Sequence, residues 1–405
     1  GYNMPVQYNG LKLEHAAVRE AVGMFDVSHM GEFFVEGPQA LDFLQTVTSN
    51  DVSRLLPGKI QYSCMPNAQG GIVDDLLIYR FTATKFLLVV NASNIEKDWA
   101  WFNSKNDTTA VLTNMSDVWS LFAIQGPNAT KVLQRLTEVE LGKMKYYTLQ
   151  TGKLAEVEDV LISATGYTGA GGFEIYVKND DAVKVWEAIM KAGEPEGIKP
   201  TGLAARDTLR LEMGYALYGN DIDDTTSPME AKLGWVTKLS TDFPSVELFR
   251  KQKENGVVTK LVAFELIDRG IPRKDYIIVS ENDDTIGRVT SGTMSPSLGK
   301  AIGLGYVNSA STKINTTIYI KIRNNLIKAM IAFTIFSALA NSVAPIFQAF
   351  TSRAVLTRSM TMWLERAARI IIWIIGLGII LDIFGIQIGP LVAGLGLFSV
   401  AVALG

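Results

Sequence analysis

The distribution of charged residues changes abruptly near Ala329 in this chain of 405 residues. Before that position, charged side chains are spread throughout, and Gly, Asn and Asp separate short apolar segments. From Ile370 to Gly405, Asp382 is the only charged residue. A helix that crosses a bilayer needs about 20 mostly apolar residues, whereas the segments of a water-soluble domain mix apolar residues with charged ones. The sequence therefore divides into residues 1–329 and 330–405, which we expect to fold in different surroundings.

The composition of the chain excludes several classes of function. A hydrophobic fraction of 48% and a charged fraction of 20% are typical of folded proteins. The formal net charge is −3, so the sequence does not predict the basic surface that nucleic-acid binding requires. One cysteine, Cys64, and two histidines cannot build an internal disulfide or a cysteine-rich or histidine-rich metal centre. We expect no metal, no nucleic-acid partner and a reducing, cytoplasmic location for residues 1–329.

Apolar periodicity in residues 1–329 predicts a mixture of helices and strands. Helical spacing occurs over residues 182–192 and 201–214, and Thr201 is the expected N-cap of the second helix. Two β-rich runs, 72–79 and 86–91, are joined by a polar turn. Several short β-like runs over residues 257–306 indicate a small all-β domain. The expected fold class is α+β, with a β-domain in the C-terminal part of this region.

The end of the sequence predicts membrane helices. Two apolar segments, residues 370–384 and 390–404, flank a short turn and follow a cluster of arginines. Arg366 and Arg369 precede the first segment, and Gly and Ala occur throughout the second. In these features the tail resembles the transmembrane region of the small-conductance mechanosensitive channel family, truncated within its third helix. The resemblance implies that residues 330–405 associate with a lipid bilayer. The alternatives are a generic membrane anchor and a pair of helices buried in a soluble core.

Two adjacent carboxylates begin the first β-rich run. Asp74 and Asp75 follow Gly70 and Gly71 and precede a strongly apolar stretch. Alternation along a strand should direct the two carboxylates to opposite faces, so one of them should point inward. A buried carboxylate needs a cation, a hydrogen-bond donor or a ligand that donates to it. The alternative is a strand-capping pair of aspartates in a turn.

Three further stretches carry polar groups that suit a ligand. Asn91 follows an apolar run and offers both a donor and an acceptor. A glycine-rich turn leads into a strand that carries Glu174, and it lacks the Lys-Ser/Thr ending of a phosphate-binding loop. The second predicted helix carries Arg206 and is followed by Tyr215. Taken singly, each of these features is more often structural than functional.

Together, these stretches resemble the folate-dependent aminomethyltransferase (T-protein) of the glycine cleavage system. Further motifs match that family in order and spacing, at residues 4–8, 14–15, 25–32, 227–231, 270–274 and 289–296. The resemblance covers nearly everything up to about Ala329. It implies a multi-domain T-protein fold with three domains around a central hole. Residues 1–240 would form two intertwined folate-binding domains, and residues 250–329 a β-barrel-like domain.

The resemblance also implies a reaction and a set of site residues. The family transfers the aminomethyl group from the dihydrolipoyl arm of H-protein to tetrahydrofolate, and it produces 5,10-methylenetetrahydrofolate and ammonia. Tetrahydrofolate is then a co-substrate, and the lipoyl-bearing H-protein is a partner. The essential aspartate of the family falls on Asp75, and a family arginine near the folate or the carrier falls on Arg273. Its folate contacts fall on Tyr62, Asn91, Glu174, Arg206 and Tyr215.

The sequence departs from this family at the end of the matched region. T-proteins have one last β-strand after residues 322–324, and we interpret that strand as replaced by the tail from Met330 onward. Two alternative functions stay open: another folate-dependent demethylase, and a channel-family fragment that carries a folate-binding passenger domain. His29 and Cys64 are interpreted as structural residues.

Overall fold

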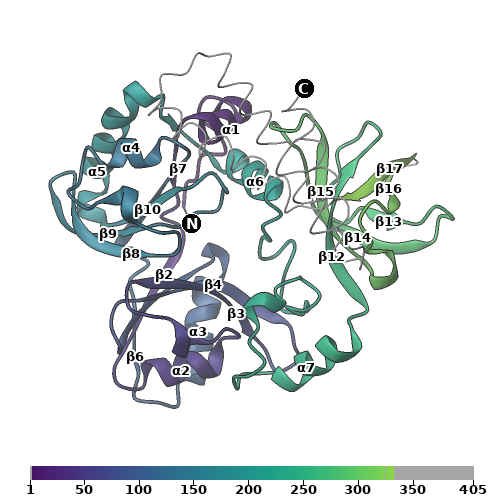
Figure 1. The fold of residues 1–405 in the computed structure, drawn as a ribbon, viewed down its shortest axis with the longest axis horizontal. Coiled ribbons are helices and arrows are strands. Elements are labelled where there is room, and N and C mark those ends of the chain that lie inside the picture. The colour runs from purple at the N-terminus through teal and green to yellow at the C-terminus, as the bar shows by residue number, and fades with distance from the viewer. Residues whose placement is uncertain (1, 324, 333–405) are drawn as a thin grey trace, which may run out of the picture. The chain divides into compact units, whose positions relative to one another are not determined.

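The computed structural model describes residues 2–323 and 325–332, which lie within one compact unit (Figure 1). Its first layer is a five-stranded sheet with the order β3-β4-β5-β2-β6. The strands are β2 (Gly31–Glu36), β3 (Lys59–Pro66), β4 (Ile72–Arg80), β5 (Lys85–Val90) and β6 (Val111–Asn114). Helices α2 (Ala40–Val47) and α3 (Ile95–Lys105) cover one face, where Phe33, Phe43 and Phe102 are fully buried. The two predicted β-rich runs are thus confirmed as β4 and β5.

The second layer is a six-stranded sheet with the order β11-β1-β7-β10-β9-β8. Its strands are β1 (Gly23–Asp26), β7 (Trp119–Gln125), β8 (Leu149–Leu154), β9 (Val157–Ser163), β10 (Gly172–Lys178) and β11 (Lys199–Pro200). Helices α4 (Ala129–Leu133) and α5 (Asn179–Gly193) pack on its outer side. Val185 and Ile189 of α5 are fully buried there, four residues apart as the helical spacing predicted.

The inner faces of the two sheets meet in a shared core. Tyr79 and Leu87 come from the first sheet, and Leu121 and Tyr176 come from the second. The hydroxyls of Tyr79 and Tyr176 are 2.8 Å apart, so the buried polar ends of both rings are satisfied. Helices α1 (Leu11–Glu20) and α6 (Leu203–Glu212) pack against each other beside this core (Figure 1).

The beginning of α6 is capped from another helix. Gly202 occupies the N-cap position and has no side chain to accept a hydrogen bond. Glu14 of α1 supplies the acceptor, because its Oε2 atom lies 2.9 Å from the Gly202 amide nitrogen. The predicted N-cap, Thr201, is wrong: its hydroxyl donates instead to the Lys199 carbonyl, 3.1 Å away.

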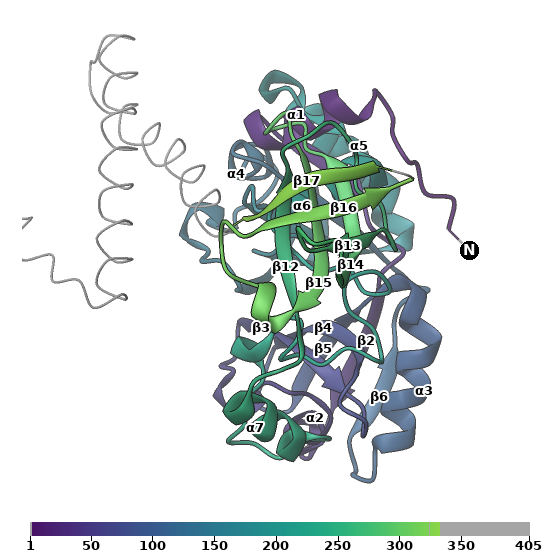
Figure 2. The ribbon, with the colours of Figure 1, turned by 90° about the vertical axis from the view of Figure 1, so that its right-hand side faces the viewer.

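The third layer is a closed barrel with the strand order β12-β15-β14-β13-β16-β17 (Figures 1 and 2). The strands are β12 (Thr259–Leu266), β13 (Ile277–Val279), β14 (Thr285–Met294), β15 (Ala301–Asn308), β16 (Thr317–Ile322) and β17 (Asn325–Ala332), and α7 (Val246–Asn255) precedes them. Val262, Phe264, Ile318 and Ile320 are among the residues that fill its interior. The predicted all-β domain is confirmed, and it extends to Ala332.

The prediction that the tail replaces the last strand is wrong. β17 pairs antiparallel with β12, with Met330 opposite Glu265 and Ala332 opposite Ala263. Ala329 and Ile331 are buried in the barrel while Lys328 is exposed, which is the alternation of a half-buried strand. The last residues of β17 are apolar and merge with the apolar stretch that follows, so composition alone misplaced the boundary.

The predicted membrane helices at residues 370–384 and 390–404, and with them the channel-like part of the sequence, lie outside the described residues. Within residues 2–323 and 325–332, no helix has both the length and the apolar character needed to cross a bilayer.

A buried ion pair joins α6 to the barrel. Arg210 is 1% exposed and Asp221 is 0% exposed, and the Nη1 and Oδ2 atoms of the pair are 2.6 Å apart. The Nη2 atom of Arg210 donates to the Ser291 hydroxyl on β14, at 2.9 Å. The Tyr306 hydroxyl on β15 donates to the Asp221 carbonyl at 2.8 Å. The Thr290 hydroxyl on β14 donates to Oδ1 of Asp221, so each of the two charges has a barrel partner in addition to the other charge.

Candidate active site

The glycine pair before β4 allows another backbone segment to approach closely. Gly70 has a φ of +92°, which favours glycine, and a Cβ atom on Gly71 would lie only 1.7 Å from the Asp224 carbonyl oxygen. The Ile72 amide donates to the Asp223 carbonyl at 3.0 Å. This contact fixes the start of β4 and therefore the positions of the two aspartates that follow.

Asp75 is held on β4 by a tyrosine and an amide. The Tyr62 hydroxyl donates to Oδ2 at 2.8 Å, and Nδ2 of Asn91 donates to Oδ1 at 2.8 Å. Burial, and then the negative charge of Asp74, raise the pKa of Asp75 to about 7. The Asp75 carboxyl therefore exchanges its proton near neutral pH, which is the property that a general acid or base needs.

Asp74 and Asp75 share one amide, although they point to opposite faces of β4 as strand alternation predicted, Asp74 toward Asn94 beside α3 and Asp75 toward Tyr62. Nδ2 of Asn91 lies 2.8 Å from Oδ1 of each carboxylate. Asp74 also accepts from the Asn91 backbone amide at 3.1 Å and from Nδ2 of Asn94 at 2.8 Å. Carboxylates only accept in these pairs, so the amide nitrogen of Asn91 has to face them. Among the described residues, Oδ1 of Asn91 accepts no hydrogen bond.

A third carboxyl lies behind this pair. Asp98 of α3 is 0% exposed, and no donor among the described residues reaches either of its oxygens. Burial, and then a hydrogen bond with Asp74, raise the pKa of Asp98 to about 10. Because that pKa lies well above 7, we expect the Asp98 carboxyl to keep its proton at neutral pH, beside Asp74. Sequence patterns did not indicate this residue, because α3 places it beside β4 only in the folded chain.

Replacing Asp98 with Asn is expected to remove a pH dependence of stability. The folded pKa of Asp98 is about 10 and its ordinary value is 3.8, so its contribution to stability is fully present below about pH 4 and is lost as the pH rises toward 10. The amide introduced in this variant keeps a donor toward Asp74 and does not titrate. As the pH rises from 5 to 8, the unmodified chain should lose up to about 4 kcal/mol of unfolding free energy that the variant keeps.

Urea unfolding at the two pH values measures this difference. Asp42→Asn, at an exposed position of α2, is the matched control for loss of one carboxylate. An equal pH dependence in Asp98→Asn and the unmodified chain would contradict a neutral Asp98.

A second cluster of polar side chains surrounds Glu174 on β10. The Thr165 hydroxyl donates to Oε2 of Glu174, and burial raises the pKa of this carboxyl. Arg206 of α6 lies within electrostatic range of Glu174, and its guanidinium carbon is 4.4 Å from the ring centroid of Tyr167. One narrow cavity is lined by Glu174, Arg206 and Tyr167, together with Phe25, Val27, Ala123, Gln125 and Thr168. The cavity thus combines a carboxylate, a cation and an aromatic wall.

Tyrosines connect this cavity to Asp75. The rings of Tyr167 and Tyr215 stack with centroids 5.7 Å apart and an interplanar angle of 28°. Burial, and then the neighbouring Tyr215, Glu174 and Asp75, raise the pKa of the Tyr147 hydroxyl. Tyr167 also donates its hydroxyl to the Ala216 carbonyl, and Ala216 and Tyr62 pack against one apolar cluster, so contacts run from the Glu174 cavity to the tyrosine that holds Asp75.

Comparison with known proteins agrees with this arrangement. Residues 1–241 match the GCVT N-terminal domain, and residues 259–337 match the glycine cleavage T-protein C-terminal barrel domain. The chain belongs to the glycine cleavage T-protein family. It is 58% identical over 331 residues to an aminomethyltransferase of Flavobacterium psychrophilum, covering 82% of this chain and 92% of that relative.

Other relatives support the same assignment. The chain is 57% identical over 333 residues to an aminomethyltransferase of Phocaeicola vulgatus, covering 82% of this chain and 92% of the relative. Its fold is similar to the crystal structure of the glycine cleavage system aminomethyltransferase T from Bartonella henselae, with a TM-score of 0.77 and 31% identity over 82% of this chain and 91% of that one. This T-protein is an aminomethyltransferase of the glycine cleavage system.

Five of the six residues predicted to bind or act on folate form direct contacts in this site or line its cavity, and Tyr215 joins them by stacking. Arg273 does not: it is exposed in the loop before β13, and in the described part of the chain its side chain has no hydrogen bond or ion pair with the site. Cys64 is buried, in agreement with a structural thiol. Burial, and then Arg206, lower the pKa of His29 to about 4, so its imidazole is neutral at pH 7.

Several aromatic residues of the site were not predicted from the sequence. Tyr167 stood in the glycine-rich stretch but carried no assigned role. Tyr146 and Tyr147 form an edge-to-face pair with centroids 4.7 Å apart, and Tyr147 has a φ of +63°. Trp235 packs on Tyr62, with ring centroids 5.9 Å apart. Clustered aromatics far apart in sequence have no periodic signal, so only the tertiary structure could identify them.

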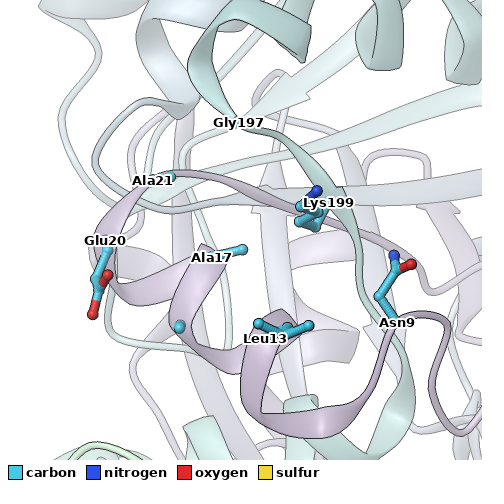
Figure 3. A pocket seen from close by; sticks show the side chains of 8 residues that line it. Asn9, Leu13, Ala17, Glu20, Ala21, Gly197 and Lys199 are labelled. Carbon is cyan, nitrogen blue, oxygen red and sulfur yellow. The ribbon is translucent and has the colours of Figure 1, made fainter.

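A wider hollow lies elsewhere, between α1 and the segment that leads into β11 (Figure 3). It has a volume of about 340 Å³ and is lined by Asn9, Leu13, Ala16, Ala17, Glu20, Ala21, Gly197, Lys199. None of the predicted site residues faces it, and it lacks a buried charge, so its chemistry does not suit the transfer reaction. Over residues 2–323 and 325–332, no group of three His, Cys, Asp or Glu residues could hold a metal ion.

Proposed function

We propose that this T-protein binds tetrahydrofolate between Glu174 and Asp75 and transfers to it the one-carbon unit carried on the dihydrolipoyl arm of H-protein. The single observation that carries the proposal is the run of contacts from the Glu174 cavity through Tyr167 and Ala216 to Tyr62, which donates to Asp75. In the reaction, the carbon–sulfur and carbon–nitrogen bonds of the aminomethyl group break and two bonds form to the folate nitrogens. The two protons displaced from those nitrogens end on the thiol and on ammonia.

The pterin end of folate suits the cavity at Glu174. Its ring carries N–H and NH2 donors, and a carboxylate can accept two of them in charge-assisted hydrogen bonds. The stacked pair Tyr167 and Tyr215 offers an aromatic wall for the flat ring. Both oxygens of the neighbouring Glu32 are buried without a hydrogen-bond partner among the described residues, and burial raises the pKa of Glu32. Further donors on a bound pterin would satisfy such groups.

Asp75 is placed for the proton transfers. Its pKa of about 7 allows it to hold or release a proton at physiological pH. Asn91 and Tyr62 fix both of its oxygens, so it also orients the folate nitrogens toward the incoming carbon. The Oδ1 atom of Asn91, which accepts no hydrogen bond from the described residues, is the group that would contact the folate. Residues 1–240 supply all of these side chains, which supports their assignment as the folate-binding region, and the barrel is joined to them through α6.

Ammonia release tests the proposed reaction directly. The full chain, supplied with aminomethylated H-protein and tetrahydrofolate, should release ammonia and form methylenetetrahydrofolate in equal amounts. Omission of tetrahydrofolate should suppress the release. Ammonia release that is equally fast without folate would overturn the proposal.

Replacing Glu174 with Gln is expected to weaken tetrahydrofolate binding about 10- to 100-fold. The glutamine side chain has almost the same shape, but its amide can accept at one atom only, and the charge-assisted hydrogen bonds are lost. Fluorescence titration of the variant with tetrahydrofolate measures the change in Kd. Glu187→Gln, at an exposed position on α5, is the matched control. An unchanged Kd in Glu174→Gln would show that the pterin lies elsewhere.

A further inference from the structure

An exposed tryptophan lies beside the proposed active site. Trp235 is 62% exposed, and no other tryptophan in the described part of the chain is similarly exposed. A large aromatic ring in water is costly unless a partner covers it, and rigid aromatic anchors dominate binding energy at many interfaces. Neither the family match nor the predicted contacts assign a role to this residue.

The backbone under Trp235 is firmly anchored. The residue lies in the short 3-10 helix η5 (Gly234–Val236), and Val236 is fully buried beneath it. The buried Ser49 donates its hydroxyl to the Val236 carbonyl at 3.1 Å and accepts the Lys238 amide at its own carbonyl, at 2.7 Å. Trp235 is therefore presented to solvent by a fixed segment, so little ordering entropy opposes binding to it.

Aromatic contacts lead from Trp235 to the reacting centre. Its ring packs on Tyr62 with an interplanar angle of 33°, and the Tyr62 hydroxyl donates to Asp75 at 2.8 Å. The polar groups that suit a pterin line the Glu174 cavity, and neither Tyr62 nor Trp235 lines that cavity. Two substrates that meet at Asp75 need separate approaches, and Trp235 offers an exposed, uncharged ring outside the cavity proposed for the pterin.

We infer that Trp235 is the entry contact for the carrier's dihydrolipoyl arm, whose hydrocarbon chain lies across the indole and passes Tyr62 to reach Asp75. The inference rests on the proposed function, because it assumes that the second substrate arrives on such an arm. An exposed uncharged ring matches an apolar chain in chemistry, and burying that chain on the indole is favourable through loss of apolar surface to water.

Steady-state ammonia release with the full chain tests the inference. At saturating tetrahydrofolate, Trp235→Ala should raise KM for aminomethylated H-protein about ten-fold, the effect of losing one moderate anchor. Trp235→Phe keeps an aromatic face and should recover most of the affinity. The Kd for tetrahydrofolate in a separate titration should change by less than about two-fold in both variants. Val183→Ala, which alters a side chain 69% exposed on α5, is the matched control.

Two further measurements separate the possible outcomes. Free dihydrolipoamide, used as an inhibitor, should bind more weakly to Trp235→Ala by a similar factor. If only intact H-protein loses affinity, Trp235 contacts the carrier's protein surface and the assignment to the arm is overturned. A raised Kd for tetrahydrofolate would place the folate tail on the indole and would also overturn it. If the unmodified chain releases no ammonia, the proposed function fails before any variant is compared.

Discussion

Asp75→Asn is expected to lose most of its turnover while it still binds tetrahydrofolate. The asparagine side chain keeps the size of the aspartate and an oxygen that can accept from Tyr62 or Asn91, so the packing of β4 should survive. It cannot take up or release a proton near neutral pH, and loss of a positioned acid or base typically costs about 10²- to 10⁴-fold in rate. Ammonia release under single-turnover conditions, with a parallel folate titration, separates chemistry from binding.

The pH profile gives this prediction a second readout. Because the pKa of Asp75 is about 7, the rate of the unmodified chain should change slope near pH 7, and this feature should be absent from the residual activity of Asp75→Asn. Tyr62→Phe is the informative control. The Tyr62 hydrogen bond lowers the pKa of Asp75 against the effect of burial, so its removal should move the inflection to higher pH. Near-normal turnover in Asp75→Asn would remove this residue from the mechanism.

The largest loss of stability is expected from Arg210→Met. The methionine removes a buried cation and leaves the Asp221 carboxylate, which is 0% exposed, without its ion-pair partner. Breaking a buried pair on one side costs about 3–5 kcal/mol, because the remaining charge is uncompensated. The midpoint of urea unfolding, followed by tryptophan fluorescence and circular dichroism, measures the loss.

Two comparison variants make this result specific. Arg250→Ala breaks an ion pair with Glu247 at the surface of α7, where both side chains are largely exposed, and should cost less than about 1 kcal/mol. A double variant, Arg210→Met with Asp221→Leu, removes both buried charges and should recover part of the loss. Equal effects of Arg210→Met and Arg250→Ala would contradict the role of Arg210 in holding the barrel to α6.

Local patterns in the sequence were sufficient for many of the elements but not for contacts between them. The spacing of Val185 and Ile189 identified α5, and the apolar run after Asp75 identified β4. The last strand was missed because its apolar residues merge with the apolar stretch after Ala332, although Lys328 marks the alternation. The N-cap of α6 was misassigned because Glu14, which lies 188 residues before Gly202 in the chain, supplies the acceptor.

In the candidate site, too, residues within sequence motifs could be predicted, whereas contacts that form only on folding could not. Motif order was enough to name Asp75, Glu174 and Arg206; the last two line one cavity, and contacts through Tyr167 and Tyr62 connect that cavity to Asp75. Alternation correctly separated Asp74, which bonds to Asn94 beside α3, from Asp75, which bonds to Tyr62, but it could not show that one amide from Asn91 reaches both carboxylates. The neutral Asp98 could not be predicted, because a carboxyl is kept protonated by the burial and the neighbours that only folding provides.

The position of two arginines on α6 has a consequence for how this enzyme transmits strain. Arg206 and Arg210 are four residues apart and lie on one face of the helix, so the first reaches the pterin cavity while the second grips the barrel. A shift of the barrel relative to α6 would therefore move both arginines together. We expect a substitution at Ser291 to change the affinity for the substrate through the position of Arg206.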